Sequence, residues 1–145
     1  MPLNDSFQRR LSDLQTALEA DPADTVALSE LSGIWLTAHQ PERGLALSRQ
    51  WTEVAPESVS AWLQLVTAYG VLERWDEAFQ ANVRLLELAP DHHLGMLNMG
   101  TIQANRQELE EARRWWSRVV EEAPGTSEAQ AAAESLSQLG GGGKP

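Results

Sequence analysis

Cysteine is absent from this 145-residue sequence, and lysine occurs once, at Lys144. The lack of cysteine excludes disulfide bonds, thiolate metal sites and thiol nucleophiles. Eleven Lys and Arg residues stand against 21 Asp and Glu residues, so the formal net charge is −10. An acidic chain repels phosphate backbones, which argues against nucleic acid as a partner.

Long apolar runs and targeting segments are also missing. No stretch approaches the roughly 18 consecutive apolar residues that a membrane span requires. Residues 1–11 lack the basic start and the apolar run of a signal peptide. We therefore expect a cytoplasmic protein that does not insert into a membrane, or else a domain cut from a longer periplasmic protein.

Motifs of catalysis and metal binding are lacking as well. The sequence has no glycine-rich phosphate loop and no nucleophile elbow, and its carboxylates fall mainly where helices are expected to begin, end or face solvent. The adjacent His92 and His93 would point in different directions on a helix, which makes them a poor metal-binding pair. We therefore predict no catalytic residue, no metal and no cofactor, with an enzyme or metalloprotein as a distant alternative.

What the sequence does contain is a repeat marked by prolines. Pro22, Pro56, Pro90 and Pro124 follow one another at intervals of 34 residues, and similar acidic and small residues precede each of them. A helix does not readily run through a proline, because the ring clashes with the preceding turn and the backbone N–H is missing. Each of these prolines therefore indicates the end of a helix.

Apolar and small residues keep the same interval and predict pairs of helices. Leu28, Trp62 and Met96 align, and so do Leu31, Leu65 and Met99. A third column, which holds Gly44, Ala78 and Ala112, marks the place where two helices must approach closely. The predicted helices span residues 5–20, 24–38, 42–54, 58–72, 76–88, 92–106, 108–122 and 127–139. The first and last are expected to be caps, packing through Leu11, Leu14, Ala17 and Leu18, and through Ala129, Ala132, Ala133, Leu136 and Leu139.

The middle repeat resembles a known signature. It reads Trp62-x-x-Leu65-Val66-x-x-Tyr69, then Ala78, then Pro90. This resembles the tetratricopeptide repeat, with W-x-x-L-G-x-x-Y followed by alanine, an aromatic residue and proline. The aromatic position holds Trp116 in the third repeat but Asn82 in the second and Ser48 in the first, and Gln103 replaces the large residue of the Trp35 and Tyr69 column.

The resemblance covers roughly residues 3–139 and implies an all-α, right-handed superhelical solenoid of antiparallel helix pairs. It divides residues 1–139, taken as one domain, into a capping helix at 5–20, repeats at 25–58, 59–92 and 93–126, and a capping helix at 127–139. Residues 140–145, which include four consecutive glycines, are expected to form a flexible tail. The sequence is also similar to small bacterial tetratricopeptide proteins of envelope, secretion or cytochrome assembly machinery.

The resemblance further implies that the first helix of each pair lines a concave groove that contacts ligands. Glu30 is the only charged residue in the corresponding columns. Exposed leucines beside small residues suit an apolar peptide or an amphipathic helix. The predicted partner-binding residues are Val26, Ser29, Gly33, Leu36, Thr37, Ser60, Leu63, Gln64, Thr67, Val71, Leu94, Leu97, Asn98, Thr101 and Asn105.

These features predict a non-catalytic adaptor or chaperone-like module that binds a partner protein or peptide through an apolar segment. Tetratricopeptide clamps for acidic chaperone C-termini carry Lys, Arg and Asn at positions that here hold Ser29, Gly33, Gln64, Leu94 and Asn98, which argues against that mechanism.

Several alternatives remain open at this stage. A rotated register would pack Leu63, Leu94 and Leu97 between helices, and the groove could instead hold the protein's own tail or a second copy. The repeats could also build a homo-oligomeric scaffold. Arg113, Arg114 and Arg118, which flank Trp115 and Trp116, fit either a second binding patch or a solvated face with arginine–aromatic packing.

Overall fold

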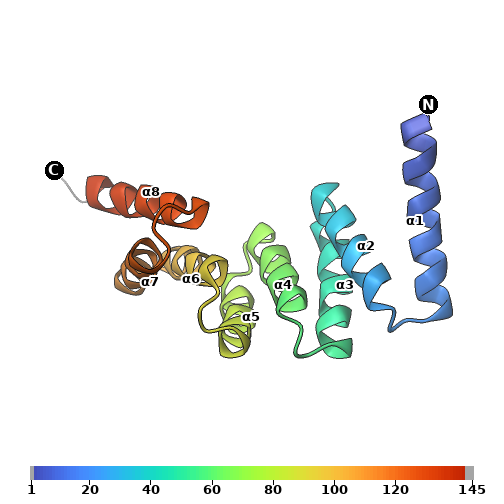
Figure 1. The fold of residues 1–145 in the computed structure, drawn as a ribbon, viewed down its shortest axis with the longest axis horizontal. Helices are drawn as coiled ribbons and strands as arrows, with labels where there is room; N and C mark the ends of the chain where they lie inside the picture. The colour runs from blue at the N-terminus through green and yellow to red at the C-terminus, as the bar shows by residue number, and fades with distance from the viewer. Residues whose placement is uncertain (1, 143–145) are drawn as a thin grey trace. The chain divides into compact units, whose positions relative to one another are not determined.

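The structure is a computed structural model that describes residues 2–142, and every regular element in that range is an α-helix. The chain divides into two compact units, residues 1–73 and 74–145. The first unit contains α1 (Pro2–Ala20), α2 (Thr25–Thr37), α3 (Pro41–Val54) and α4 (Val59–Val71). The second contains α5 (Trp75–Leu88), α6 (His93–Asn105), α7 (Leu109–Glu122) and α8 (Ser127–Gly142). The helices agree with the predicted ranges to within a few residues at each end (Figure 1).

Within each unit, helices that follow one another in the chain pack together (Figure 1). In the first unit α2 packs against α1 and α3, and α4 packs against both α3 and α2. In the second unit α6 packs against α5 and α7, and α8 packs against both α7 and α6. This is the pairwise packing that the 34-residue interval predicts, since each repeat of such an array buries its apolar face against its neighbours.

Four helix starts are capped by side chains at equivalent positions of the repeat. Asp24 accepts a hydrogen bond from the backbone N–H of Ala27 (3.1 Å), and Ser58 accepts one from Ala61 (3.2 Å). His92 Nδ1 accepts from the N–H of Gly95 (3.0 Å), and Thr126 Oγ1 accepts from that of Ala129 (3.1 Å). Each cap satisfies a backbone donor that the first helical turn leaves free. The structure therefore assigns His92 a capping role.

The turns inside the helix pairs also repeat. His39, Glu73 and Gln107 lie 34 residues apart and adopt left-handed backbone conformations, with φ of 59°, 57° and 68°. The next residue closes the turn in the first and third repeats: the N–H of Gln40 donates to the carbonyl of Trp35, and that of Glu108 to Gln103, both at 2.8 Å. These bonds satisfy carbonyls at the helix C-terminus.

The column of small residues lies where the helices of a pair meet, as predicted. Gly44, Ala78 and Ala112 are all buried. The polar residues that replace the aromatic residue in the first two repeats are also buried. Ser48 Oγ donates a hydrogen bond to the carbonyl of Gly44 (2.7 Å), and Asn82 Nδ2 donates one to the carbonyl of Gly95 (2.9 Å). At these two positions internal hydrogen bonds therefore replace aromatic packing, and the helices still pair.

The two terminal helices pack through apolar faces close to the predicted ones. In the first unit Leu11, Ala17 and Leu18 pack against a cluster of Leu14, Ala27 and Leu31. In the second, Leu136 and Leu139 pack with buried Ala132 against α6 and α7.

Two expectations for α8 were wrong. Ala133 is exposed, because it lies beyond the edge of the packed face, roughly 80° around the helix from its middle at 100° per residue. The helix also continues to Gly142 instead of ending at Leu139, so Gly140 to Gly142 extend its backbone ladder despite their low helix propensity. The rest of the predicted tail, residues 143–145, lies outside the described residues. A single solenoid over residues 1–139 stays a prediction.

Candidate partner-binding surfaces

Ten of the predicted partner-binding residues lie on α2 and α4 in the first unit, and none of them is buried. Among the residues whose exposure the structure describes, Val26 and Val71 are the most exposed large apolar side chains, at 62% and 57%. The two helices contact each other, and a Cβ atom at Gly33 would lie 3.5 Å from Gln64 Nε2, so their outward residues share one surface. We call this surface the α2/α4 face; it consists of Val26, Ser29, Gly33, Thr37, Ser60, Leu63, Gln64, Thr67 and Val71.

Leu36 does not belong to this face. Its Cγ atom lies 2.7 Å from the place that a Cβ on Gly44 would occupy, so it packs against the backbone of α3. Leu36 lies at the edge of the predicted surface, roughly 65° around α2 from its middle, given 100° per residue. Its role is to close the α2–α3 interface where the glycine permits close approach.

The other five predicted residues lie on α6 in the second unit. Thr101 and Asn105 are exposed, Leu94 is 36% exposed, and Leu97 and Asn98 are half-buried. Leu97 packs against the cluster formed by Met96, Ala112, Trp116, Val119 and Ala132. The leucines therefore divide: Leu94 projects from α6, whereas Leu97 packs in part between helices, as the rotated-register alternative proposed for it.

The hydroxyl groups on these helices are turned back onto their own backbone. Thr37 Oγ1 donates to the carbonyl of Gly33 (2.9 Å), Thr67 Oγ1 to Leu63 (2.9 Å) and Thr101 Oγ1 to Leu97 (3.3 Å). A threonine hydroxyl has one proton to donate, and here the helix uses it. These residues can therefore offer a ligand a methyl group and a hydroxyl oxygen that only accepts, so the surface has fewer free donors than its composition suggests.

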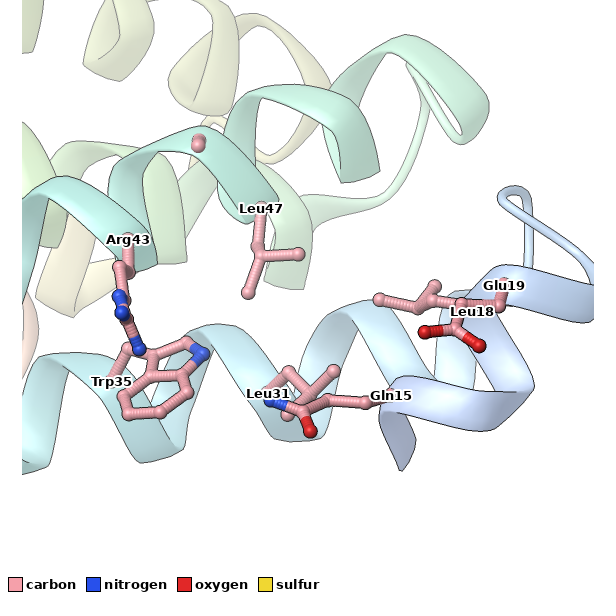
Figure 2. A pocket seen from close by; sticks show the side chains of 8 residues that line it. Gln15, Leu18, Glu19, Leu31, Trp35, Arg43 and Leu47 are labelled. Atoms are coloured by element: carbon pink, nitrogen blue, oxygen red, sulfur yellow. The ribbon is translucent and has the colours of Figure 1, made fainter. Parts of the chain in front are cut away.

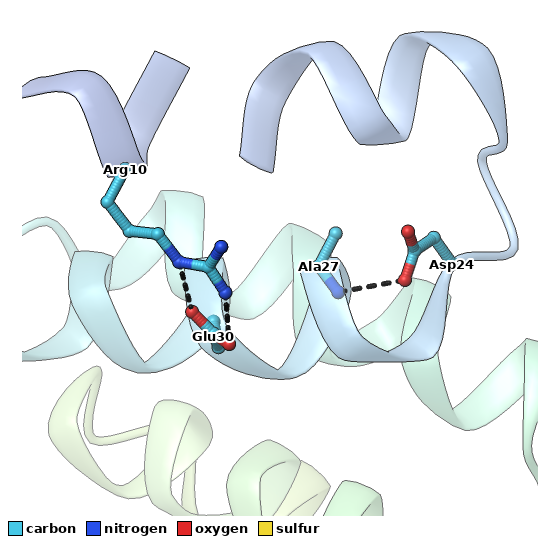
Figure 3. Close-up of polar contacts among 4 residues, drawn as sticks. All are labelled: Arg10, Asp24, Ala27 and Glu30. Carbon is cyan, nitrogen blue, oxygen red and sulfur yellow. Dashed lines mark hydrogen bonds and ion pairs between the residues drawn. The ribbon is translucent and has the colours of Figure 1, made fainter. Parts of the chain in front are cut away.

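The one charge in these columns is paired within the protein. Glu30 on α2 accepts two hydrogen bonds from Arg10 on α1, from Nε at 3.0 Å and from Nη2 at 2.5 Å (Figure 3). The hydrogen bond and the charge of Glu30 raise the pKa of Arg10 above its ordinary value. Because both groups are about half exposed, this pair contributes little to stability. Its effect is to neutralise the surface beside the α2/α4 face.

Two small cavities border the α2/α4 face. One, of about 350 Å³, lies between Phe7 of α1 and the C-terminal end of α2 at Gly33, Ile34, Thr37 and Ala38. The other, of about 380 Å³, lies between Val26 and Ser29 of α2, Trp51 of α3 and Ser58. Sequence analysis missed Phe7 because it lies outside the first-helix columns, although it stands 34 residues before Pro41 in the column that also holds Trp75 and Leu109.

A larger cleft of about 590 Å³ opens between α1 and α3, with α2 beneath it (Figure 2). Sequence analysis did not predict it. We call it the Trp35 cleft; it is lined by Gln15, Leu18, Glu19, Leu31, Trp35, Arg43, Ala46 and Leu47. Leu31 and Trp35 lie roughly 140° to 180° around α2 from the middle of the predicted surface, given 100° per residue. The cleft is therefore on the other side of this helix.

The arginines near the paired tryptophans of α7 are engaged with acids of the same helix. Arg114 pairs with Glu111 (2.8 Å), Arg118 with Glu122 (2.9 Å) and Arg113 with Glu110 (3.8 Å). The guanidinium of Arg118 also lies 5.7 Å from the ring centre of half-buried Trp115. This arrangement is a charge-paired helix face with arginine–aromatic packing.

Residues 2–142 contain neither a cluster of three metal-ligating side chains nor a helix that is long and apolar enough to span a membrane.

Comparison with known proteins supports the fold through structure alone. No family model matches the sequence, and no curated protein matches it. A crystal structure of MamA matches with a TM-score of 0.82 at 16% identity, covering 96% of this chain and 82% of that one. The first TPR domain of Spaghetti (RPAP3), bound to the HSP90 peptide SRMEEVD, matches with a TM-score of 0.74 at 18% identity, covering 81% of this chain and 91% of that one.

The second TPR domain of human RPAP3, in complex with the HSP70 peptide SGPTIEEVD, gives a TM-score of 0.73 at 16% identity, over 80% of this chain and 94% of that one. These similarities, together with the helix pairs, confirm the predicted all-α fold of tetratricopeptide type. At such low identity they establish the fold, whereas function must be argued from the surfaces of this chain.

Proposed function

We propose that this protein is a non-catalytic interaction module that binds an apolar peptide or amphipathic helix of a partner protein on the α2/α4 face. The observation that carries the proposal is an uncharged surface with exposed apolar side chains, on which the threonine hydroxyl protons are already used within the protein. Val26 and Val71 are more than half exposed at the two ends of this face, and Thr37 and Thr67 use their hydroxyl protons within their own helices. Exposed apolar surface of this kind is typical of an interaction site.

The comparison structures support peptide binding as a use of this fold, and the surface of this chain favours a different ligand. The two RPAP3 domains hold peptides that end in Glu-Glu-Val-Asp. The α2/α4 face presents Ser29, Gly33 and Gln64 where a clamp for such termini would need cations, and its neighbouring Arg10 is engaged with Glu30. An uncharged surface selects a ligand by the shape and apolarity of its side chains.

The proposal can be tested with random peptides of about 12 residues displayed on phage, a length that spans the face in extended form. Selection against the full chain should enrich peptides with apolar residues and no preference for a terminal carboxylate. Val26→Glu and Val71→Glu should each weaken the selected peptides at least tenfold in fluorescence anisotropy, because a charge would be buried against an apolar ligand. Both side chains are exposed, so the melting temperature should stay near that of the wild type.

Val54→Glu provides the matched control. Val54 lies on α3 and is 39% exposed, so the same chemical change is made on another helix. The proposal is wrong if the selected peptides bind all three variants as tightly as the wild type. It is also wrong if light scattering shows a mass that rises with concentration and that Val26→Glu abolishes, since the face would then serve self-assembly.

A further inference from the structure

The Trp35 cleft has the dimensions of a binding site and an apolar floor. Its volume of about 590 Å³ lies within the range of roughly 300–1,000 Å³ found for ligand sites. Leu18 projects into it from α1, Leu31 and Trp35 from α2, and Leu47 from α3 (Figure 2). It shares no side chain with the α2/α4 face, so a ligand could occupy it independently.

The third repeat shows how the same position of the fold can be filled. The residues 68 positions after Leu18 and Leu47 are Leu86 and Trp115. Both pack against the buried cluster around Met96 and Trp116 in the second unit. The first repeat has the smaller Leu47 at the position of this indole. The Trp35 cleft lies where the larger side chain of a tryptophan would extend.

The charges at this position differ in the same way. In the third repeat Glu111 pairs with Arg114 at 2.8 Å. In the first repeat Arg43 stands in place of the glutamate and Ala46 in place of the arginine. Arg43 therefore has no acidic partner at this position of its own helix. Arg43 forms no ion pair with any residue in the described range 2–142, and its guanidinium lies 4.6 Å from the ring centre of Trp35. A guanidinium stacked in this way keeps its N–H groups available for a carboxylate.

Charge also distinguishes the two ends of the cleft. Arg43 stands over Trp35 at the α3 side, while Glu19 lines the α1 side near Leu18 (Figure 2). Glu19 likewise has no ion pair among residues 2–142. A ligand that carries an anion is therefore favoured at Arg43 and disfavoured at Glu19, which would fix the direction in which it lies.

We propose that the Trp35 cleft is a second docking site, which takes an amphipathic helix of a partner protein carrying a carboxylate. The helix places apolar side chains between Leu18 and Leu47, over Leu31 and Trp35, and its Asp or Glu pairs with Arg43. Helix-in-groove recognition of this type uses apolar anchors at intervals of three and four residues, with charge setting register and orientation.

The test uses a displayed library of amphipathic helices about 18 residues long, or about five turns. Their apolar stripe is drawn from Leu, Met and Phe, and the flanking positions are drawn from Asp, Glu, Lys, Arg, Ser and Gln. Selection is made against the full chain carrying Val26→Glu and Val71→Glu, which suppresses binding to the α2/α4 face. The enriched helices should carry Asp or Glu at one fixed flanking position, and their titration should shift the indole N–H resonance of Trp35.

Variants of the cleft then separate the contributions. Leu47→Trp, which copies Trp115 of the third repeat, should weaken the enriched helices at least tenfold, because the indole fills the space they need. Arg43→Gln should weaken them several-fold, and selection repeated on Arg43→Glu should enrich Lys or Arg at the same position. Val54→Trp, which adds the same side chain to an exposed position of α3, should leave binding unchanged.

The inference is overturned if no helix is enriched, or if the enriched helices bind Leu47→Trp as tightly as the parent. It is also overturned if Arg43→Gln has no effect and the flanking position shows no acidic preference. Because Leu47 packs in part against the core, Ala46→Phe serves as a second obstructing variant from an exposed position. Failure of the proposed function would leave this result intact, since Val26→Glu and Val71→Glu would then be neutral surface substitutions.

Discussion

Replacement of Gly100 by alanine tests the helix packing of the second unit most directly. Gly100 lies in α6 beneath the indole of Trp116, and a Cβ atom there would lie 2.3 Å from Nε1 and 2.4 Å from Cδ1. Trp116 is 5% exposed within the cluster of Met96, Ala112, Val119 and Ala132, so its rigid ring has no room to withdraw. Overpacking of this kind costs about 1–3 kcal/mol, and three ring atoms closer than 3 Å favour the upper end.

Helix propensity opposes this cost, because alanine is about 1 kcal/mol better than glycine inside a helix. The expected net effect of Gly100→Ala is a loss of about 2 kcal/mol, or a melting temperature lower by about 4–8 °C for a chain of this size. Gly33→Ala is the matched control in α2, where the nearest atom, Gln64 Nε2, lies at an ordinary 3.5 Å. It should raise the melting temperature by about 2–4 °C, since only the propensity gain remains.

Thermal and urea unfolding followed by circular dichroism measure both effects. A Gly100→Ala variant as stable as the wild type would refute the packing argument. A double-mutant cycle assigns the cause: in a Trp116→Leu background, adding Gly100→Ala should be neutral or stabilising, because the clashing ring is gone. If the alanine stays equally harmful without the indole, the clash with Trp116 is not the reason.

Two further predictions concern buried polar groups and turns. Asn82→Ala should cost about 1–2 kcal/mol in urea unfolding through loss of the bond to the Gly95 carbonyl, and Asn82→Asp should cost more, because a carboxylate has no proton to donate to that oxygen. Equal losses in the two variants would contradict this. His39→Gly and Gln107→Gly should each raise stability by about 0.5–1 kcal/mol, since both positions have positive φ; a lower melting temperature would count against it.

The fold was predictable because its signals are local and repeated. Pro56, Pro90 and Pro124 mark helix ends by removing a backbone donor, which needs no knowledge of neighbouring helices. Ser58, Asp24 and Thr126 cap helix starts through contacts three residues along the chain. Errors in the helix bounds were confined to helix ends, as at Gly140 to Gly142, where the helix continues through residues of low propensity.

The surface was only partly predictable, because spacing gives the direction of a side chain and not its neighbours. Val26 and Val71 lie exposed as expected, but Leu36 packs on Gly44 of the adjacent helix. The neutralisation of Glu30 depends on Arg10, which comes from α1, 20 residues earlier in the chain. Such long-range pairs follow from the arrangement of the helices, and no local sequence pattern predicts them.

The Trp35 cleft escaped prediction for a different reason. A search for repeats looks for positions at which the repeats agree, and those positions form the shared core. Function in a repeat protein depends on positions at which the repeats differ, because the backbone is common and only side chains can distinguish one unit from the next. The first repeat has Leu47 where the third has Trp115, and Arg43 where the third has Glu111, and both differences are visible in the aligned sequence. Their meaning requires the structure, which shows that both positions line one space between α1 and α3.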